Sequence, residues 1–305
     1  MDRLILSLIQ DKGKIMNTSF SLTYWRDVLL TALAPAIWGS TYIVTTQFLP
    51  PDRPFTAALI RVLPAGILLL LIARRLPAYR DTGRLLILSA LNIGVFQALL
   101  FIAAYRLPGG LAAVIGAIQP LLVMVLAWAV DHRVPRQITL WAALSGLLGM
   151  TVLLLSPHTV FEPVGITAAL LGAVCMAIGV WLTRRWQINL PVMALTGWQL
   201  VSGGLMLAPV AWMVDAPLPA LTRTQYAAYA YLCLAGAFIA YGLWFRGIKH
   251  LPGVAVASLG LLSPLAAVLL GWIVLSQALS GTALAGLFMV LLSVFVVQYT
   301  SVRSN

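Results

Sequence analysis

The chain of 305 residues is 61% hydrophobic and only 9% charged, with a formal net charge of +11. A soluble domain carries roughly 25% charged residues, so this composition excludes a soluble protein and indicates an integral membrane protein. The Lys and Arg residues lie in short segments between apolar runs, which is typical of membrane topology and argues against nucleic-acid binding.

The first residues form a short, mildly amphipathic stretch with no small-residue cleavage site after it, so it does not read as a signal peptide. We expect residues 1–28 to be a cytoplasmic segment that is disordered or lies at the membrane interface. A spanning helix needs about 20 mostly apolar residues, and ten such runs follow. They cover residues 29–48, 55–73, 85–105, 109–130, 138–156, 163–183, 192–213, 225–245, 253–273 and 280–300.

The basic residues predict the orientation of these ten helices. Of the 19 Lys and Arg residues, Arg61 falls inside the second run, and Arg53, Arg106 and Arg223 fall on one side of the membrane. The other fifteen fall on the opposite side. Positive residues gather in cytoplasmic loops, so both termini are predicted to be cytoplasmic, which requires an even number of spans.

The second half of the chain repeats the first. Residues 107–128 and 251–272 share nine of 22 residues at an offset of 144, and a weaker match links residues 54–70 to 191–207 at an offset of 137. We predict an all-α integral membrane protein with two five-helix repeats, residues 29–156 and 163–300. Because five is odd, the repeats are inverted, an arrangement typical of secondary transporters that work by alternating access. A duplication without alternating access is the other interpretation.

The most informative matches are glycines and prolines. Pro108 and Pro252 stand at predicted helix starts, where a missing N–H costs nothing. Twelve residues later, roughly 18 Å deeper, stand a second pair of prolines. A proline there bends the helix at the residue four positions earlier, which is a glycine in both repeats. We predict paired hinges that line a central path, and a simple packing kink is the alternative. The hinge residues are Gly116, Pro120, Gly260 and Pro264.

Polar and aromatic residues inside the predicted spans are candidates for a substrate cavity, because such sites combine apolar walls with a few polar groups. The candidates are Trp38, Tyr42, Asn92, Gln97, Gln119, Trp181, Trp198, Gln199, Tyr241, Trp244 and Ser263. Arg61 has two interpretations: its side chain reaches the outer headgroups, or it contacts a substrate carboxylate.

No acidic residue lies near the middle of a predicted span. Proton-coupled pumps usually keep such a carboxylate, so we expect facilitated transport of neutral or zwitterionic solutes. Cys175 and Cys233 lie in apolar runs without a metal-binding spacing, and no nucleophile set is found. We therefore expect no cofactor, no metal and no enzymatic activity.

The AIWGSTY stretch at residues 36–42, the ten spans and the paired proline motifs resemble the drug/metabolite transporter superfamily, EamA type. The stretch YRLPGGLAAVIGAIQPL at residues 105–121 is similar to its YddG branch of amino-acid exporters. The resemblance implies a cavity built from spans 1–4 and 6–9, with spans 5 and 10 outside. It maps the family's Trp-Gly to Trp38 and Gly39, and it places Met176 where the family has a second Trp.

The resemblance thus implies a multi-pass transporter of the inner membrane that exports aromatic and other neutral amino acids. An exporter of drugs or of other small metabolites, such as nucleotide-like compounds or lipid precursors, is the alternative. The expected partners are the solute and the lipid bilayer, with the protein a monomer or a weak homodimer.

Overall fold

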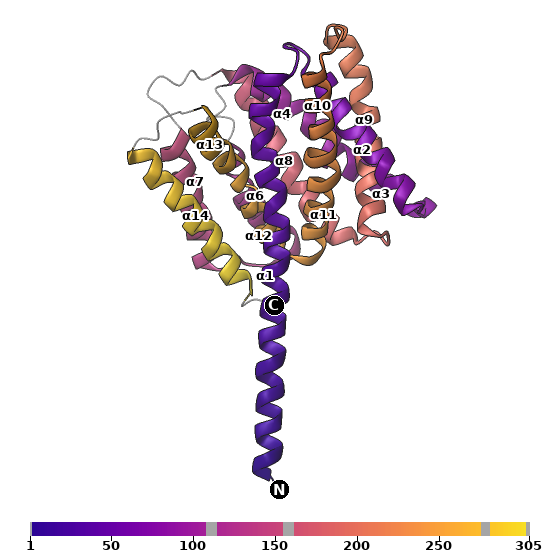
Figure 1. Ribbon diagram of the computed structural model, residues 1–305. Helices are drawn as coiled ribbons and strands as arrows, with labels where there is room; N and C mark the ends of the chain where they lie inside the picture. Colours follow the sequence, from indigo (N-terminus) through magenta and orange to yellow (C-terminus); the bar gives the residue numbers. More distant parts are fainter. Residues whose placement is uncertain (1, 108–114, 155–161, 276–280, 303–305) are drawn as a thin grey trace.

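The computed structural model describes residues 2–107, 115–154, 162–275 and 281–302, with side chains described from Leu22 onward except at a few positions. All regular secondary structure in these ranges is helical (Figure 1). The helices of the first half are α1 (Asp2–Phe48), α2 (Pro54–Ala73), η1 (Tyr79–Asp81), α3 (Thr82–Ser89), η2 (Ala90–Gly94), α4 (Val95–Arg106), α6 (Gln119–Asp131) and α7 (Gln137–Leu154). Those of the second half are α8 (Pro163–Trp186), α9 (Val192–Val214), α10 (Arg223–Cys233), η3 (Leu234–Ile239), α11 (Ala240–His250), α12 (Gly253–Leu259), α13 (Leu262–Leu275) and α14 (Gly281–Val302).

Eight helical segments of the described residues are long and apolar enough to cross a membrane. The first of them, Leu22–Thr45, begins earlier than the predicted residue 29. Two further helices, Gln119–Asp131 and Gln137–Leu153, are apolar but shorter. They fall on the predicted spans 109–130 and 138–156, which both run into ranges that the structure does not describe. The chain is therefore a multi-span membrane protein, and ten crossings stay a prediction.

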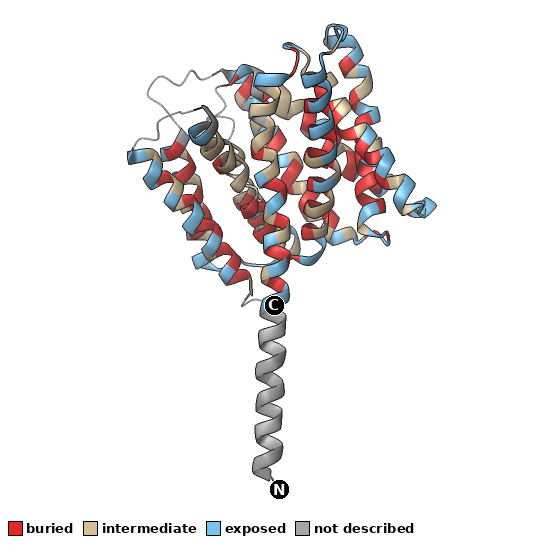
Figure 2. Cartoon of the chain, viewed as in Figure 1, coloured by how far each residue is buried: buried red, intermediate tan, exposed pale blue. Residues whose placement is uncertain are grey.

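The helices pair across the two halves of the chain in a regular way. Helix α2 packs along α9, and α7 packs along α14. Helix α1 packs against α11 and α13, while its counterpart α8 packs against α4 and α6. Exchanging each helix for the one in the same position of the other half leaves this set of contacts unchanged. Buried residues lie on the facing sides of these helices (Figure 2).

Helices α1 and α13 approach each other closely at Gly39. A Cβ atom on Gly39 would lie only 2.5 Å from the carbonyl oxygen of Ser263 and 2.5 Å from the Cβ of Ala266. Atoms cannot approach that closely, so this contact requires a residue without a side chain. The Trp-Gly pair of the first span thus places Trp38 beside the contact between the two halves.

The two mid-span prolines, Pro120 and Pro264, each follow a break in their helix. In the second half, α12 ends at Leu259 and α13 begins at Leu262, and the N–H of Gly260 donates to the carbonyl of Ala257 at 3.1 Å, a tighter turn than an α-helix makes. In the first half, the N–H of Ile118 donates to the carbonyl of Ile115 at 3.2 Å, directly before α6. The structure thus shows an interrupted helix at each site, and movement about it stays a prediction.

Two π-helical turns also occupy corresponding places. The turn η2 lies within the third predicted span and η3 within the eighth. A π turn widens the helix by one residue and changes which backbone carbonyls are paired within it, and such turns are frequent at functional sites. In η3, the carbonyl oxygen of Gly236 accepts hydrogen bonds from side chains of two other helices, Trp38 and Arg61.

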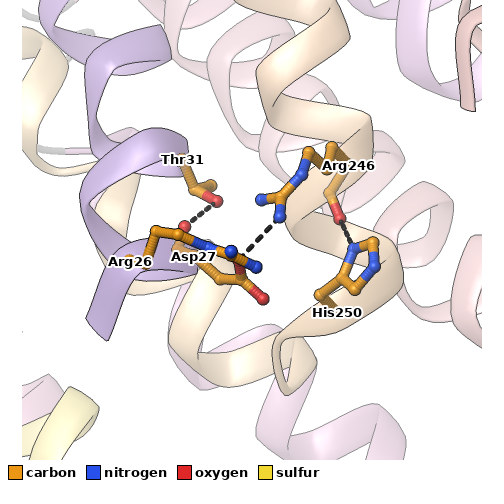
Figure 3. A network of polar contacts seen from close by, with 5 residues as sticks. All are labelled: Arg26, Asp27, Thr31, Arg246 and His250. Atoms are coloured by element: carbon orange, nitrogen blue, oxygen red, sulfur yellow. Dashed lines mark hydrogen bonds and ion pairs between the residues drawn. The ribbon is translucent and has the colours of Figure 1, made fainter. Parts of the chain in front are cut away.

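An ion pair joins α1 to α11 (Figure 3). Asp27 lies near the start of the span Leu22–Thr45, so the pair is at the end of α1 opposite the α1–α2 loop. Arg246 Nη2 donates to Asp27 Oδ1 at 2.7 Å, and the Asp27 side chain is almost fully buried. Thr31 Oγ1 donates to the Asp27 carbonyl at 2.6 Å, and His250 Nδ1 lies 2.8 Å from the Arg246 carbonyl oxygen. Asp27 lies near the start of the first candidate span, so it agrees with the prediction that no acid lies at mid-span.

Candidate substrate cavity

A cavity of about 660 Å³ lies between the two halves of the chain. Its walls come from α1, α2, α4, α8, α11 and α12 and from the two interrupted helices, and Pro51 and Asp52 of the α1–α2 loop lie at one end. None of its described lining residues comes from α7, α9 or α14. Predicted spans 5 and 10 therefore lie outside the cavity, as the resemblance implied. Span 7, which corresponds to α9, does not line it.

Three aromatic side chains form one wall of the cavity. The ring of Trp38 lies 5.0 Å from that of Tyr241 and 5.2 Å from that of Trp244, measured between centroids, in tilted arrangements. Trp38 Nε1 donates to the carbonyl oxygen of Gly236 at 2.9 Å, and Gln97 Nε2 donates to the Tyr241 hydroxyl. The hydrogen bonds fix the orientation of the Trp38 and Tyr241 rings, and all three residues line the cavity although Tyr241 and Trp244 are only 2% exposed.

Several polar groups around this cavity are buried without a hydrogen-bond partner among the described residues. A buried polar group without a partner costs free energy, and in native proteins it usually binds water or a ligand. Five such atoms belong to residues that line the one cavity, which is the pattern of a site for a partly polar solute. They are Thr41 Oγ1, Arg61 Nε, Gln97 Oε1, Gln119 Nε2 and Trp244 Nε1.

Arg61 lies inside the protein. Its residue is only 5% exposed, and its Nη2 donates to the carbonyl oxygen of Gly236 at 3.2 Å. The interpretation in which Arg61 reaches towards the headgroups is therefore wrong. The reason is local: η3 offers a free carbonyl within reach, and the ring of Tyr241 lies 5.9 Å from the guanidinium carbon.

The interrupted helices also contribute to the cavity. Gly116, Gln119, Gly260, Ser263 and Pro264 line it, whereas Pro120 is buried beside it. A side chain at Gly116 would not crowd the bend, because a Cβ there would meet no atom of the described residues within 4 Å. A Cβ at Gly260 would lie 3.0 Å from the carbonyl oxygen of Ala257, so only this second position is tight.

Asn92 and Gln199, predicted as cavity residues, lie elsewhere. Asn92 Nδ2 donates to Gln199 Oε1 at 2.7 Å and to Thr183 Oγ1 at 3.4 Å, so the group joins η2, α8 and α9. Trp198 packs with Leu85 and other apolar residues, and its Nε1 donates to the carbonyl oxygen of Arg75 at 3.0 Å. These hydrogen bonds join neighbouring parts of the bundle and contribute to helix packing, while Asn92 Oδ1 and Gln199 Nε2 stay buried without a partner among the described residues.

Trp181 lies at a second cavity, of about 1050 Å³, near the α6–α7 loop. Its Nε1 donates to Asp131 Oδ2 at 2.7 Å, and the guanidinium of Arg185 lies 5.1 Å from its ring while pairing with Asp131. Trp181 is thus not a wall of the first cavity. The side chain of Tyr42, another predicted cavity residue, lies outside the described residues.

The sequence reasoning did not select several lining residues. Phe96 and Phe101 flank Gln97 on α4, and Thr41 lies in the AIWGSTY stretch one turn after Trp38. Helical spacing from Trp38 could have indicated Thr41. No sequence pattern indicates that the Gly236 carbonyl accepts hydrogen bonds at the cavity, because a π turn is not visible in composition or periodicity.

Two segments of the chain match a model of the EamA-like transporter family, residues 25–155 and 163–299. The chain belongs to the EamA-like transporter family. The predicted superfamily is thereby confirmed, and the protein is a membrane transporter of small metabolites. It is 44% identical over 275 residues to Protein PecM of Dickeya dadantii, covering 89% of this chain and 92% of that protein.

This EamA-like transporter is also 29% identical over 243 residues to the uncharacterized inner membrane transporter YedA of Escherichia coli K12, covering 77% and 78% of the two chains. A crystal structure of a protein shares its fold, with a TM-score of 0.75 and 18% identity over 92% of this chain and 99% of that chain. These relatives support the membrane location and the fold, and their names state no solute.

Proposed function

We propose that this EamA-like transporter exports aromatic and other neutral amino acids, or related metabolites, across the inner membrane by facilitated alternating access. The set of unpartnered polar groups around one mostly apolar cavity carries the proposal. A zwitterionic solute with an apolar side chain would pair with those groups and cover the rings of Trp38, Tyr241 and Trp244.

Two observations support alternating access between inverted repeats. The family model matches the chain twice, and the helix contacts are unchanged when the halves are exchanged. The cavity reaches Asp52 at one end, while the Asp27–Arg246 ion pair holds α1 to α11 at the other end. With the orientation predicted from the basic residues, this arrangement is the outward-facing one.

Transport by purified protein in liposomes tests the proposal. We expect radiolabelled tryptophan, methionine and threonine to equilibrate faster than in empty vesicles, and Trp38→Ala or Tyr241→Ala to lower the rate at least about ten-fold. Trp212→Ala is the matched control, because Trp212 is 90% exposed on α9 and lies outside the cavity. If vesicles with and without the protein equilibrate every amino acid at the same rate, the proposed solutes are refuted.

An exporter of drugs or other small metabolites is the second candidate. The apolar side chains of Phe96, Leu100, Phe101 and Met176 along the cavity favour it, because such a surface also accepts apolar organic compounds. Growth of overexpressing cells on toxic amino-acid analogues separates the two, since resistance is expected only for an amino-acid exporter.

We further propose that a monomer in the bilayer, or at most a weak homodimer, carries out transport.

A further inference from the structure

Arg61 of α2 is a buried cation in the wall of the main cavity. Its residue is 5% exposed, and it is the only basic residue among the described residues that line this cavity. The other charged lining residue is Asp52, an exposed residue of the α1–α2 loop. An arginine cannot lose its proton in a protein, so the cavity holds a permanent positive charge.

The contacts of Arg61 hold it in place without neutralising it. Nη2 donates to the carbonyl oxygen of Gly236 at 3.2 Å, and the guanidinium carbon lies 5.9 Å from the ring centroid of Tyr241. Gly236 lies directly beside the guanidinium, since a Cβ there would be in ordinary contact with Arg61 Nε at 3.6 Å. A carbonyl and a ring orient the guanidinium, which still has Nε buried without a partner.

No carboxylate balances this charge within the described part of the chain. The ion pairs found there use Arg26, Arg80, Arg84, Arg106, Arg185 and Arg246, and none includes Arg61. An unpaired charge inside a membrane protein is costly. A cation that is oriented, unpaired and placed at a cavity is the state expected of an anion-binding group before its ligand arrives.

We propose that Arg61 binds the carboxylate of the transported solute, and that a carboxylate on an apolar body is what this cavity selects. The planar guanidinium donates two parallel N–H groups to a carboxylate, which gives orientation as well as affinity. The rings of Trp38 and Tyr241 then lie beside the apolar body. Among described residues, no acid lies deep in the cavity to select an amino group. The carboxylate is thus required and the amine is not.

This inference rests on the proposed function, and four indole compounds test it by binding to the purified full chain in lipid nanodiscs. Tryptophan and indole-3-propionate carry a carboxylate, whereas tryptamine and tryptophanol do not. We expect the two carboxylates to bind at least about ten-fold more tightly than the other two, the usual effect of one hydrogen bond to a charged group. Arg61→Gln should remove this difference, and Arg61→Lys should keep part of it.

Arg223→Gln is the matched control, because it removes the same charge from an exposed residue at the start of α10. It should leave all four affinities unchanged. Retained thermal stability of Arg61→Gln shows that any loss of binding is local. If that variant does not fold, Arg61→Lys tests the role of Arg61, since it should weaken the two carboxylates and leave tryptamine and tryptophanol unchanged.

The outcomes separate this inference from the proposed function. Binding of indole-3-propionate that depends on Arg61, without binding or transport of tryptophan, would refute the amino-acid proposal and leave the carboxylate site standing. Normal tryptophan transport by Arg61→Gln would refute the carboxylate site and leave the amino-acid proposal standing. Equal binding of tryptamine and tryptophan, or no binding of either carboxylate, also overturns the assignment of Arg61.

Discussion

At the cavity wall, Trp38 and Arg61 donate hydrogen bonds to the same acceptor, the carbonyl oxygen of Gly236. Three helices thus meet at one backbone atom, since Trp38 is on α1, Arg61 on α2 and Gly236 in η3. The π turn makes this contact available, because it leaves a carbonyl free to accept from side chains. The site therefore depends on backbone shape as much as on side-chain identity.

Gly116 gives a test at the same scale. A Cβ at Gly116 meets no atom of the described residues within 4 Å and lies at the cavity, so Gly116→Leu is expected to lower transport strongly by filling the site, with little change in thermal stability. Gly242→Leu is the control, because a Cβ at Gly242 also meets no atom within 4 Å but lies outside the cavity. Transport assays and thermal unfolding measure the two effects, and normal transport by Gly116→Leu would contradict this reading.

At the scale of elements, the predicted spans agree with the helices because apolar runs bounded by charge and proline determine where a chain can cross a membrane. The polar candidates were less predictable. Gln97 and Gln199 both lie inside apolar helices, yet one faces the cavity and the other pairs with Asn92 between helices. The sequence shows that a polar residue lies in the middle of an apolar helix. Which neighbour it contacts depends on how that helix is rotated about its axis in the bundle.

Helices α1 and α13 pack so closely at Gly39 that the contact leaves no room for a side chain there. Gly39→Ala is expected to destabilise the protein by about 1–3 kcal/mol, the usual cost of overpacking, because its Cβ would overlap the Ser263 carbonyl and Ala266. Gly83→Ala in α3 is the control, since a Cβ there meets nothing within 4 Å. Thermal unfolding followed by size-exclusion chromatography measures the change, and equal midpoints for both variants would contradict the prediction.

For the whole molecule, two ion pairs occupy similar places in the two halves. Asp27 on α1 pairs with Arg246, one turn before the end of α11, and Glu162 before α8 pairs with Arg106 at the end of α4. Helices α1 and α8 are the first helices of the two halves. Helix α4 belongs to the third span of the first half, and α11 belongs to the third span of the second half. Inversion of the repeats would place one pair at each membrane face: Asp27–Arg246 on the side where the cavity is closed, and Glu162–Arg106 on the side to which it opens.

This arrangement predicts different effects of two matched substitutions. In a Cys175→Ser, Cys233→Ser background, Ala257→Cys supplies one thiol in the cavity wall. Asp27→Asn should increase labelling of that thiol by an impermeant reagent from the side of Arg246. Glu162→Gln should leave labelling from the side of Arg106 unchanged, because the cavity already opens to that side. Equal labelling before and after Asp27→Asn would contradict a gating role for the pair.

The repeat itself was readable from sequence, because Gly116, Pro120, Gly260 and Pro264 are residue types with specific backbone consequences. The partner of each helix was not readable in this way. Arg106 and Glu162 are ordinary loop charges in the sequence, and their relation to Arg246 and Asp27 becomes visible only once the helices are packed.

The two ion pairs differ in their access to water. The Asp27 and Arg246 side chains are 7% and 25% exposed, whereas those of Glu162 and Arg106 are 31% and 53% exposed. Dissolved salt screens exposed charges far more than buried ones. Raising the ionic strength on the Arg106 side would therefore weaken the Glu162–Arg106 pair and leave the Asp27–Arg246 pair almost intact. We therefore expect dissolved salt to change the contact between the halves on the Arg106 side far more than on the Arg246 side.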